Sequence, residues 1–154
     1  MIAVQVITTF QVKPTYFIKN NCLRNEKSEN PKNILIIEDD DDVRALLEFF
    51  LVREGYAVDF AVDGEQAIRK IQSNNLYSLI LLDIMMPYHD GFEILKHIKS
   101  NNNWKDVPVI MITALDDEEN ISRSYELGIR DYLGKPFDPD MVLKKIKHLL
   151  ESPE

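Results

Sequence analysis

The stretch Leu79-Ile80-Leu81-Leu82-Asp83 places a carboxylate directly after four apolar residues. Three other runs end on polar groups in the same way: Ile34–Ile37 before Glu38-Asp39, Val109–Ile112 before Thr113, and Tyr132-Leu133 before Lys135-Pro136. Short runs rich in Ile, Leu and Val, separated by helical patterns, are typical of buried parallel strands. Ligands of open α/β sheets bind beyond the carboxyl ends of the strands. The sequence therefore predicts that three carboxylates, a hydroxyl and an ammonium meet at one edge, a set that suits a divalent cation and a phosphoryl group.

Strands and helices are expected to alternate from Asn33 onward. The predicted strands are Ile34–Ile37, Ala57–Val62, Leu79–Leu82, Val107–Ile112 and Ile129–Leu133. Between the first two, the apolar residues from Val43 to Leu51 recur at helical spacing, and Gly55 would end that helix. Five β–α units with right-handed crossovers require helices on both faces of the sheet. We therefore predict an α/β fold with a doubly wound, five-stranded parallel sheet of order 2-1-3-4-5, the flavodoxin-like arrangement.

The first part of the chain differs from the rest. Residues 1–32 carry five Lys/Arg and two Asp/Glu, a net charge of +3, whereas residues 33–154 carry thirteen and twenty-four, a net charge of −11. Residues 1–12 have strand-like content, and residues 19–33 are polar and turn-prone. We predict an N-terminal extension and linker over residues 1–32 and one folded domain over residues 33–152. An added strand, a docking arm and a disordered leader all remain open for the extension.

Composition argues against several classes of function. The net charge of −8 disfavours a general binder of nucleic acid or of anionic membranes. The chain has no run of about 18 apolar residues, so we expect no membrane insertion. Cys22 is the only cysteine, which rules out an intrachain disulfide and agrees with a cytoplasmic location.

Five motifs, in this order and at this spacing, carry a specific resemblance. They are Ile-Leu-Ile-Ile-Glu-Asp-Asp at 34–40, Leu-Ile-Leu-Leu-Asp-Ile-Met-Met-Pro at 79–87, Asp90-Gly91-Phe92, Val-Ile-Met-Ile-Thr-Ala at 109–114, and Asp-Tyr-Leu-Gly-Lys-Pro-Phe at 131–137. Over about residues 33–150, the chain resembles the receiver domain of bacterial two-component response regulators, in particular the stand-alone, chemotaxis-regulator type.

The resemblance implies a magnesium site beside a phospho-acceptor. Asp83 would accept the phosphoryl group, and Asp39 would bind Mg²⁺ directly, together with Asp83 and the backbone carbonyl of Met85. Glu38 would hold the metal mostly through water. This assignment agrees with elementary chemistry, because a carboxylate is a competent nucleophile for phosphoryl transfer. Mg²⁺ binds one or two carboxylates together with phosphate, which relieves the repulsion between these acids and an anionic substrate.

The resemblance also implies a catalytic set and a switch. Thr113 would bind a phosphoryl oxygen and Lys135 would pair with the phosphoryl charge, so Asp83, Thr113 and Lys135 form the predicted catalytic residues. Thr113 and Tyr132 match the switch positions: Thr113 would move toward the phosphoryl group and Tyr132 would turn inward. The Lys135–Pro136 peptide bond is expected to be cis.

These roles predict a phospho-accepting receiver rather than an enzyme acting on separate substrates. A histidine of a sensor kinase or a phosphotransfer protein would supply the phosphoryl group to Asp83. A downstream protein would bind the face formed by the fourth helix, the fifth strand and the fifth helix, without direct contact to nucleic acid, and a homodimer is kept as an option. Because few residues follow the last predicted helix, we expect no attached output domain.

Three alternatives remain open. The chain would be either a stand-alone receiver or the receiver fragment of a DNA-binding regulator or of a hybrid kinase. A receiver that never becomes phosphorylated would act as an adaptor, although all five site positions are intact. A phosphatase of the haloacid dehalogenase type needs a second Asp two residues after the nucleophile, where Met85 stands.

Overall fold

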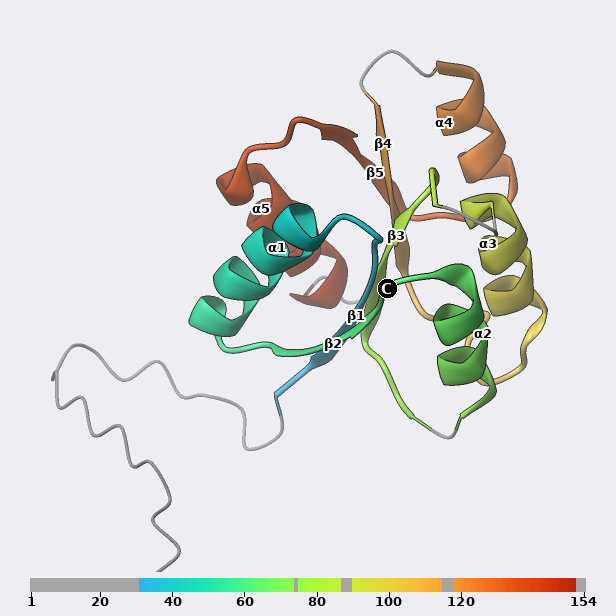
Figure 1. Ribbon diagram of the computed structural model, residues 1–154, viewed down its shortest axis with the longest axis horizontal. Helices are drawn as coiled ribbons and strands as arrows, with labels where there is room; N and C mark the ends of the chain where they lie inside the picture. Colours follow the sequence, from blue (N-terminus) through green and yellow to red (C-terminus); the bar gives the residue numbers. More distant parts are fainter. Residues whose placement is uncertain (1–30, 74, 87–89, 115–117, 152–154) are drawn as a thin grey trace, which may run out of the picture.

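The computed structural model describes residues 31–73, 75–86, 90–114 and 118–151. Its elements follow in the order β1 (Asn33–Ile37), α1 (Asp41–Glu54), β2 (Ala57–Ala61), α2 (Gly64–Gln72), β3 (Leu79–Asp83), α3 (Gly91–Ser100), β4 (Val109–Ala114), α4 (Glu118–Glu126), β5 (Asp131–Lys135) and α5 (Pro139–Glu151). The strands form one parallel sheet of order β2-β1-β3-β4-β5 (Figure 1). The predicted fold class and strand order are confirmed. Residues 1–30 of the predicted extension and residue 152 of the predicted domain lie outside the described residues.

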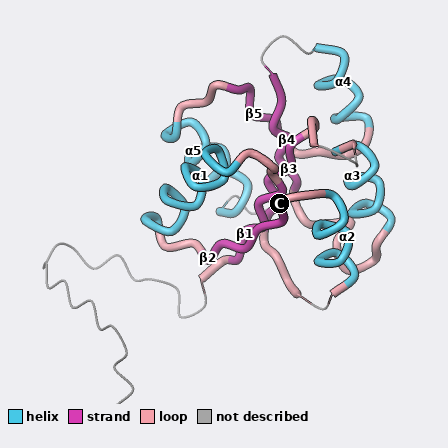
Figure 2. Tube along the Cα trace, in the orientation of Figure 1, coloured by secondary structure: helices cyan, strands magenta, loops and turns pink. Residues whose placement is uncertain are grey.

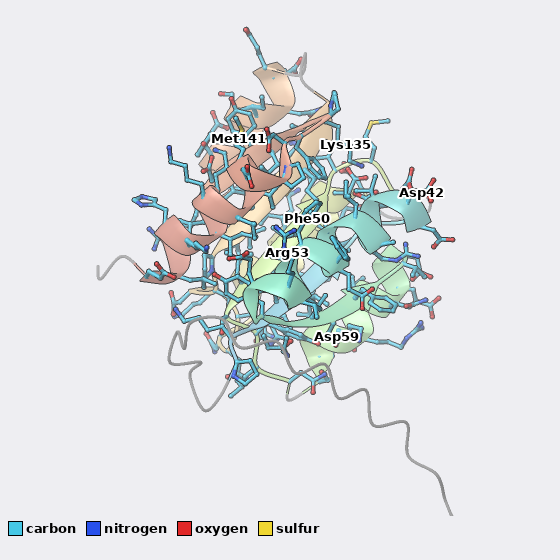
Figure 3. All side chains as sticks on the ribbon, turned by 90° about the vertical axis from the view of Figure 1, so that its left-hand side faces the viewer. Asp42, Phe50, Arg53, Asp59, Lys135 and Met141 are labelled. Atoms are coloured by element: carbon cyan, nitrogen blue, oxygen red, sulfur yellow. The ribbon has the colours of Figure 1, made fainter. Side chains whose placement is uncertain are left out.

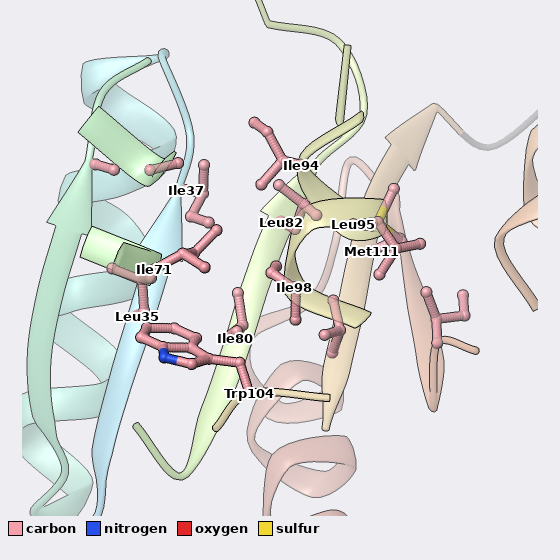
Figure 4. Close-up of a cluster of buried hydrophobic side chains, with 14 of the residues drawn as sticks. Leu35, Ile37, Ile71, Ile80, Leu82, Ile94, Leu95, Ile98, Trp104 and Met111 are labelled. Carbon is pink, nitrogen blue, oxygen red and sulfur yellow. The ribbon is translucent and has the colours of Figure 1, made fainter. Parts of the chain in front are cut away.

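Helices cover both faces of the sheet. α1 and α5 lie on one face, and α2, α3 and α4 lie on the other (Figure 1, Figure 2). Along β1, Ile34 and Ile36 are buried in the cluster on the α1 and α5 side, whereas Leu35 and Ile37 belong to the cluster on the opposite side (Figure 4). Successive strand residues point to opposite faces, so a strand covered on both sides has to be apolar throughout. Among the described residues, none of the helices combines the length and the apolar character that spanning a bilayer requires.

The predicted bounds of two strands are wrong. β4 is Val109–Ala114 rather than Val107–Ile112, and β5 is Asp131–Lys135 rather than Ile129–Leu133. Both strands begin and end two residues later, because the hydrogen-bonded ladder and not the apolar run sets their limits. The β4–β5 register ends with Ala114 opposite Lys135. Thr113 and Lys135 are therefore held by paired backbone and do not lie in the loops beyond the strands.

A polar cluster joins β2 to α2 and to the segment before β3. Lys70 Nζ lies 2.8 Å from Asp59 Oδ1 and 2.7 Å from Oδ2, and the Tyr77 hydroxyl donates to Oδ2. Burial by itself would raise the pKa of Asp59, but the hydrogen bonds from Lys70 and Tyr77 outweigh it and lower that pKa below its ordinary value. Ionised Asp59 therefore stabilises the folded state.

Replacing Asp59 with asparagine should lower the free energy of unfolding by about 1 kcal/mol at pH 7. The pKa of Asp59 is lower in the folded state than in the unfolded state. Its contribution to stability is therefore complete at pH values above the unfolded-state pKa, and it is lost as the pH falls through the folded-state pKa. Urea unfolding of wild type and D59N at pH 7 and at pH 3 measures both effects. A stability difference that stays the same at the two pH values would contradict this assignment.

Candidate functional site

The carboxyl ends of β1 and β3 bring two acidic segments to one place. Ile37 pairs with Leu82 in the parallel register, so Glu38 and Asp83 follow at adjacent positions of the same sheet edge. Asp39 comes next along the chain, and Asp40 then caps α1, because its Oδ1 accepts the N–H groups of Asp42 and Val43 at 2.9 and 3.1 Å. Asp40 thus belongs to the helix cap, whereas Glu38 and Asp39 belong to the site.

Three carboxylates and one ammonium converge at this edge. One carboxylate oxygen each from Glu38, Asp39 and Asp83 lies within 4.8 Å of the others. Glu38 is 0% exposed and Asp83 4%, whereas Asp39 is exposed. Lys135, labelled in Figure 3, extends from the end of β5 and donates to Asp83 Oδ2 at 2.9 Å and to Glu38 Oε1 at 3.0 Å. The structure therefore brings together four predicted site residues from three separate strand ends.

The charges in this cluster depend on one another. Burial, reinforced by the charge of Asp83, raises the pKa of Glu38 to about 7 against the opposing effect of Lys135. Burial would lower the pKa of Lys135, but its hydrogen bonds to Glu38 and Asp83 prevail and raise it. Lys135 therefore stays charged at neutral pH, and Glu38 lacks enough positive charge nearby to offset its burial.

The donor set fits a hard divalent cation. Glu38 Oε2 lies 2.9 Å from Lys135 Nζ, but it accepts no hydrogen bond from the described residues. A buried oxygen in that state is costly unless another positive group satisfies it. Mg²⁺ takes oxygen ligands from one or two carboxylates and retains several waters. Glu38, Asp39 and Asp83 therefore form a chemically suitable magnesium site.

Met85 contributes to this site through its backbone. Its N–H donates to Asp83 Oδ1 at 3.1 Å, and its side chain is exposed. Together with Lys135 on Oδ2, this bond fixes the orientation of the Asp83 carboxylate. The predicted role of the Met85 carbonyl as a metal ligand stays a prediction.

Thr113 and Tyr132 occupy neighbouring strands. Ile112 pairs with Asp83, so Thr113 is the next residue of β4 beyond Asp83, and its side chain is buried. Tyr132 on β5 is half-buried, and its ring meets the ring of Tyr125 edge-on with centroids 6.3 Å apart. Lys145 Nζ from α5 lies 5.5 Å from the centre of the Tyr132 ring. Tyr132 thus touches both α4 and α5, and the Lys135–Pro136 bond that follows β5 is cis, as expected.

Sequence reasoning missed Arg44. Its Nη1 donates to the backbone carbonyl of Glu38 at 2.7 Å, and its guanidinium lies 5.7 Å from the centre of the Phe60 ring. These contacts tie α1 to the loop that carries Glu38 and Asp39. A signal for Arg44 was available, since it lies at spacings of 3 and 7 from Leu47 and Leu51, which makes it a charged residue on an apolar stripe.

Gly91, at the start of α3, lies against the backbone of Asp83 and Ile84. A Cβ on Gly91 would lie 2.4 Å from the Asp83 carbonyl oxygen and 2.8 Å from Ile84 Cα, both of them backbone atoms. The Gly91 N–H donates to the Ile84 carbonyl at 3.0 Å. Only glycine allows the start of α3 to approach the backbone of Asp83 this closely.

Replacing Gly91 with alanine should destabilise the protein by about 1–3 kcal/mol, the usual cost of overpacking. Alanine favours the helix over glycine by roughly 0.5–1 kcal/mol, so helix propensity alone would make G91A more stable. A loss of stability in G91A would therefore report the steric clash of the added Cβ. Thermal unfolding of G91A and wild type measures it. An unchanged or higher midpoint would show that the close approach to Asp83 is unimportant.

Comparison with known proteins gives a consistent result. A family model described as the response regulator receiver domain matches residues 34–147. Transcriptional regulatory protein ResD of Bacillus subtilis (strain 168) is 43% identical over 121 residues, which are 79% of this chain and 49% of ResD. Transcriptional regulatory protein GltR of Pseudomonas aeruginosa is 40% identical over 126 residues, which are 80% of this chain and 50% of GltR. The chain thus spans about half the length of the curated relatives it matches.

Solved structures agree with this result. Chemotaxis protein CheY4 of Vibrio cholerae superposes with a TM-score of 0.74 at 29% identity, covering 79% of this chain and 100% of CheY4. The receiver domain of sensor histidine kinase PA1611 from Pseudomonas aeruginosa PAO1, solved with a magnesium ion in its active-site cleft, superposes with a TM-score of 0.73 at 29% identity and covers 80% and 100% of the two chains. With the family model spanning most of the chain, this protein belongs to the receiver domain family of two-component response regulators.

Proposed function

We propose that Asp83 accepts a phosphoryl group from a phosphohistidine in a magnesium-dependent reaction, and that the resulting charge switches a protein-binding surface. The observation that carries this proposal is the arrangement around Asp83. A buried carboxylate, oriented by Lys135 at 2.9 Å and by the Met85 N–H at 3.1 Å, shares its site with the carboxylates of Glu38 and Asp39. Asp83 supplies a nucleophile, Lys135 supplies a fixed cation, and the three carboxylates supply ligands for a divalent metal ion.

Each residue would have a distinct part in the transfer. Mg²⁺, held by Glu38, Asp39 and Asp83, would neutralise charge on the transferring group when bound. Lys135 supplies a fixed positive charge, and Thr113 supplies a neutral donor at the end of β4. An Asp83 oxygen forms the new O–P bond while the P–N bond of the phosphohistidine breaks, and the imidazole takes the electron pair. Positioning and charge neutralisation account for most catalysis of phosphoryl transfer.

The switch would act through Tyr132. A phosphoryl group adds a charge of about −1.5 to −2 beside Lys135 and Thr113. In the proposal, Thr113 moves toward that group and Tyr132 turns into the space it leaves. The contacts of Tyr132 with Tyr125 of α4 and Lys145 of α5 would carry this change to the α4, β5 and α5 face. Phosphorylation would thereby shift the balance between two conformations.

The partners follow from the same proposal. The donor would be a sensor histidine kinase or a phosphotransfer protein, and the product would be the phosphorylated protein itself, so Asp83 serves no separate substrate. A cytoplasmic location and signalling through a protein target remain expectations. The similarity to ResD and GltR favours a second possibility, that this receiver regulates transcription as part of a longer protein.

The test is the intact mass of the full chain after incubation with Mg²⁺ and acetyl phosphate. Wild type should gain about 80 Da, the mass of one phosphoryl group, and chelation of Mg²⁺ by EDTA should abolish the gain. D83N should show no gain, whereas D140N, which changes an exposed carboxylate on α5, should behave as wild type. Absence of an adduct in wild type would favour the unphosphorylated adaptor. Repeated turnover of p-nitrophenyl phosphate would favour the hydrolase.

A further inference from the structure

The outer side of β2 is an unpaired sheet edge among the described residues. Ala57 N–H donates to the Lys32 carbonyl and the Ala61 carbonyl accepts from Glu38 N–H, so the backbone groups of Ala57, Asp59 and Ala61 face β1. Those of Val58 and Phe60 therefore face outward. The Phe60 N–H donates to Asp59 Oδ1 at 2.9 Å, whereas no described residue of another strand pairs with the Val58 N–H. Edges of this kind readily take up an additional strand.

Apolar side chains are exposed beside this edge. Phe49 is 62% exposed, Val52 53% and Phe60 43%. A shallow hollow on α1 is lined by Ala45, Glu48, Phe49, Val52 and Arg53, on the side of the molecule that Figure 3 turns toward the viewer. The side chain of Phe60 lies under the guanidinium of Arg44, which places it next to α1. Exposed apolar side chains on one side of a folded domain favour contact with another segment or chain.

Residues 2–12 have the pattern of a strand with one apolar face. Their even positions are Ile2, Val4, Val6, Thr8, Phe10 and Val12, and their odd positions include Gln5, Thr9 and Gln11. The odd positions Ala3 and Ile7 are also apolar and the even position Thr8 is polar, but the other five even positions are all apolar, which favours a strand with one more apolar face. The stretch contains no charged residue and no proline, so it would be prone to aggregate if it stayed unpaired.

The chain between this stretch and β1 is long enough to reach β2. The Lys32 carbonyl already accepts the Ala57 N–H at 3.0 Å, so the described part of the chain begins beside the start of β2. Residues 13–30 can span up to about 60 Å when extended, whereas five paired residues need about 17 Å. Residues 13–30 carry four Lys/Arg and two Asp/Glu, and residues 41–61 carry two Arg and five Asp/Glu. Opposite net charges, +2 and −3, favour an approach to this side of the sheet.

We infer that residues 2–12 add a strand to the outer edge of β2 and place their even-numbered side chains against the exposed surface of α1 and Phe60. The side chains of Val58 and Phe60 point to the α1 side, because Val58 packs into the cluster of α1 and α5. A strand paired with β2 sends every second side chain to that same side. The inference does not depend on phosphorylation of Asp83, and it selects the added strand from the three alternatives for the extension.

Amide hydrogen exchange of the full chain, followed residue by residue by NMR, tests the added strand. The variant V6P/F10P introduces two prolines into residues 2–12, which removes ladder donors, and the matched control N20P/S28P introduces two prolines into the linker. The Val58 amide should exchange at least about tenfold more slowly in wild type and in N20P/S28P than in V6P/F10P. The Asp59 amide, which faces β1, should exchange at one rate in all three proteins.

Three results would overturn the inference. Equal exchange of the Val58 amide in all three proteins would mean that residues 2–12 do not pair with β2. Protection of Val58 that grows with protein concentration, together with a dimer in gel filtration, would assign the edge to a second copy of the chain. Faster exchange at Asp59 as well as Val58 in V6P/F10P would indicate a general loss of stability instead of a lost edge strand.

Discussion

Replacing Lys135 with methionine should slow magnesium-dependent phosphorylation of Asp83 by about 10²–10³-fold, the usual effect of removing one preorganised donor from a site where negative charge develops. Lys135 Nζ donates to both Asp83 Oδ2 and Glu38 Oε1, so its positive charge lies directly against the proposed acceptor. Methionine retains the length and apolar character of the stem but lacks the ammonium. The rate of adduct formation with acetyl phosphate, measured by intact mass at saturating Mg²⁺, gives the effect.

Two further variants make this result interpretable. K135M leaves Glu38 buried without its ion pair, which can cost about 3–5 kcal/mol, so its fold is checked by circular dichroism. K135R retains the charge but replaces a compact ammonium with a planar guanidinium, and it should remain folded while still losing rate. K147M removes an α5 cation that pairs with Glu54 of α1 at 2.7 Å, away from the acidic cluster, and this variant should become phosphorylated at the wild-type rate. A wild-type rate in folded K135M would refute the role of Lys135.

In the absence of metal, D83N should melt about 3 °C or more above wild type, and Mg²⁺ should reverse this order. Glu38 and Asp83 share the Lys135 ammonium and Asp39 lies close to both carboxylates, so loss of the Asp83 charge relieves repulsion while Lys135 keeps its bond to Glu38. At a Mg²⁺ concentration about 100 times its Kd, binding should stabilise wild type by about 2.7 kcal/mol. D83N lacks one of the three carboxylates and should gain much less.

Thermal unfolding in EDTA and across a Mg²⁺ titration measures both parts of this expectation. D140N changes the net charge by the same amount away from the site, and it should follow wild type under both conditions. A metal-free D83N that melts below wild type would mean that the bonds of Asp83 to Lys135 and Met85 outweigh the repulsion. Equal Mg²⁺ responses of D83N and wild type would place the metal elsewhere.

The sequence predicted the residues of the site better than the limits of the elements that carry them. Glu38, Asp39 and Asp83 follow apolar runs, and that local pattern was enough to place them at one sheet edge. For β4 and β5 the same pattern was misleading, because pairing continues through Thr113 and Lys135, whose side chains are polar. A ladder depends on backbone hydrogen bonds between strands, which an apolar run in one strand does not reveal.

Other features depend on contacts between segments distant in the chain. The interaction of Arg44 with the Glu38 carbonyl requires α1 to lie over the β1 loop. Gly91 appeared in the sequence only as part of a motif, whereas in the fold its missing Cβ makes room for the Asp83 carbonyl. Neither the bridging of Glu38 and Asp83 by Lys135 nor the raised pKa of Glu38 follows from any single segment.

From the sequence alone came the parallel α/β sheet, the strand order and the identity of the acidic residues, because apolar runs and the polar groups that end them are local patterns. Only the tertiary structure decided how those groups meet. Glu38 and Asp83 share the Lys135 ammonium although they lie 97 and 52 positions away from Lys135 in the chain, and the Glu38 side chain is fully buried. Distances and desolvation depend on three-dimensional packing, and here they raise the pKa values of Glu38 and Lys135.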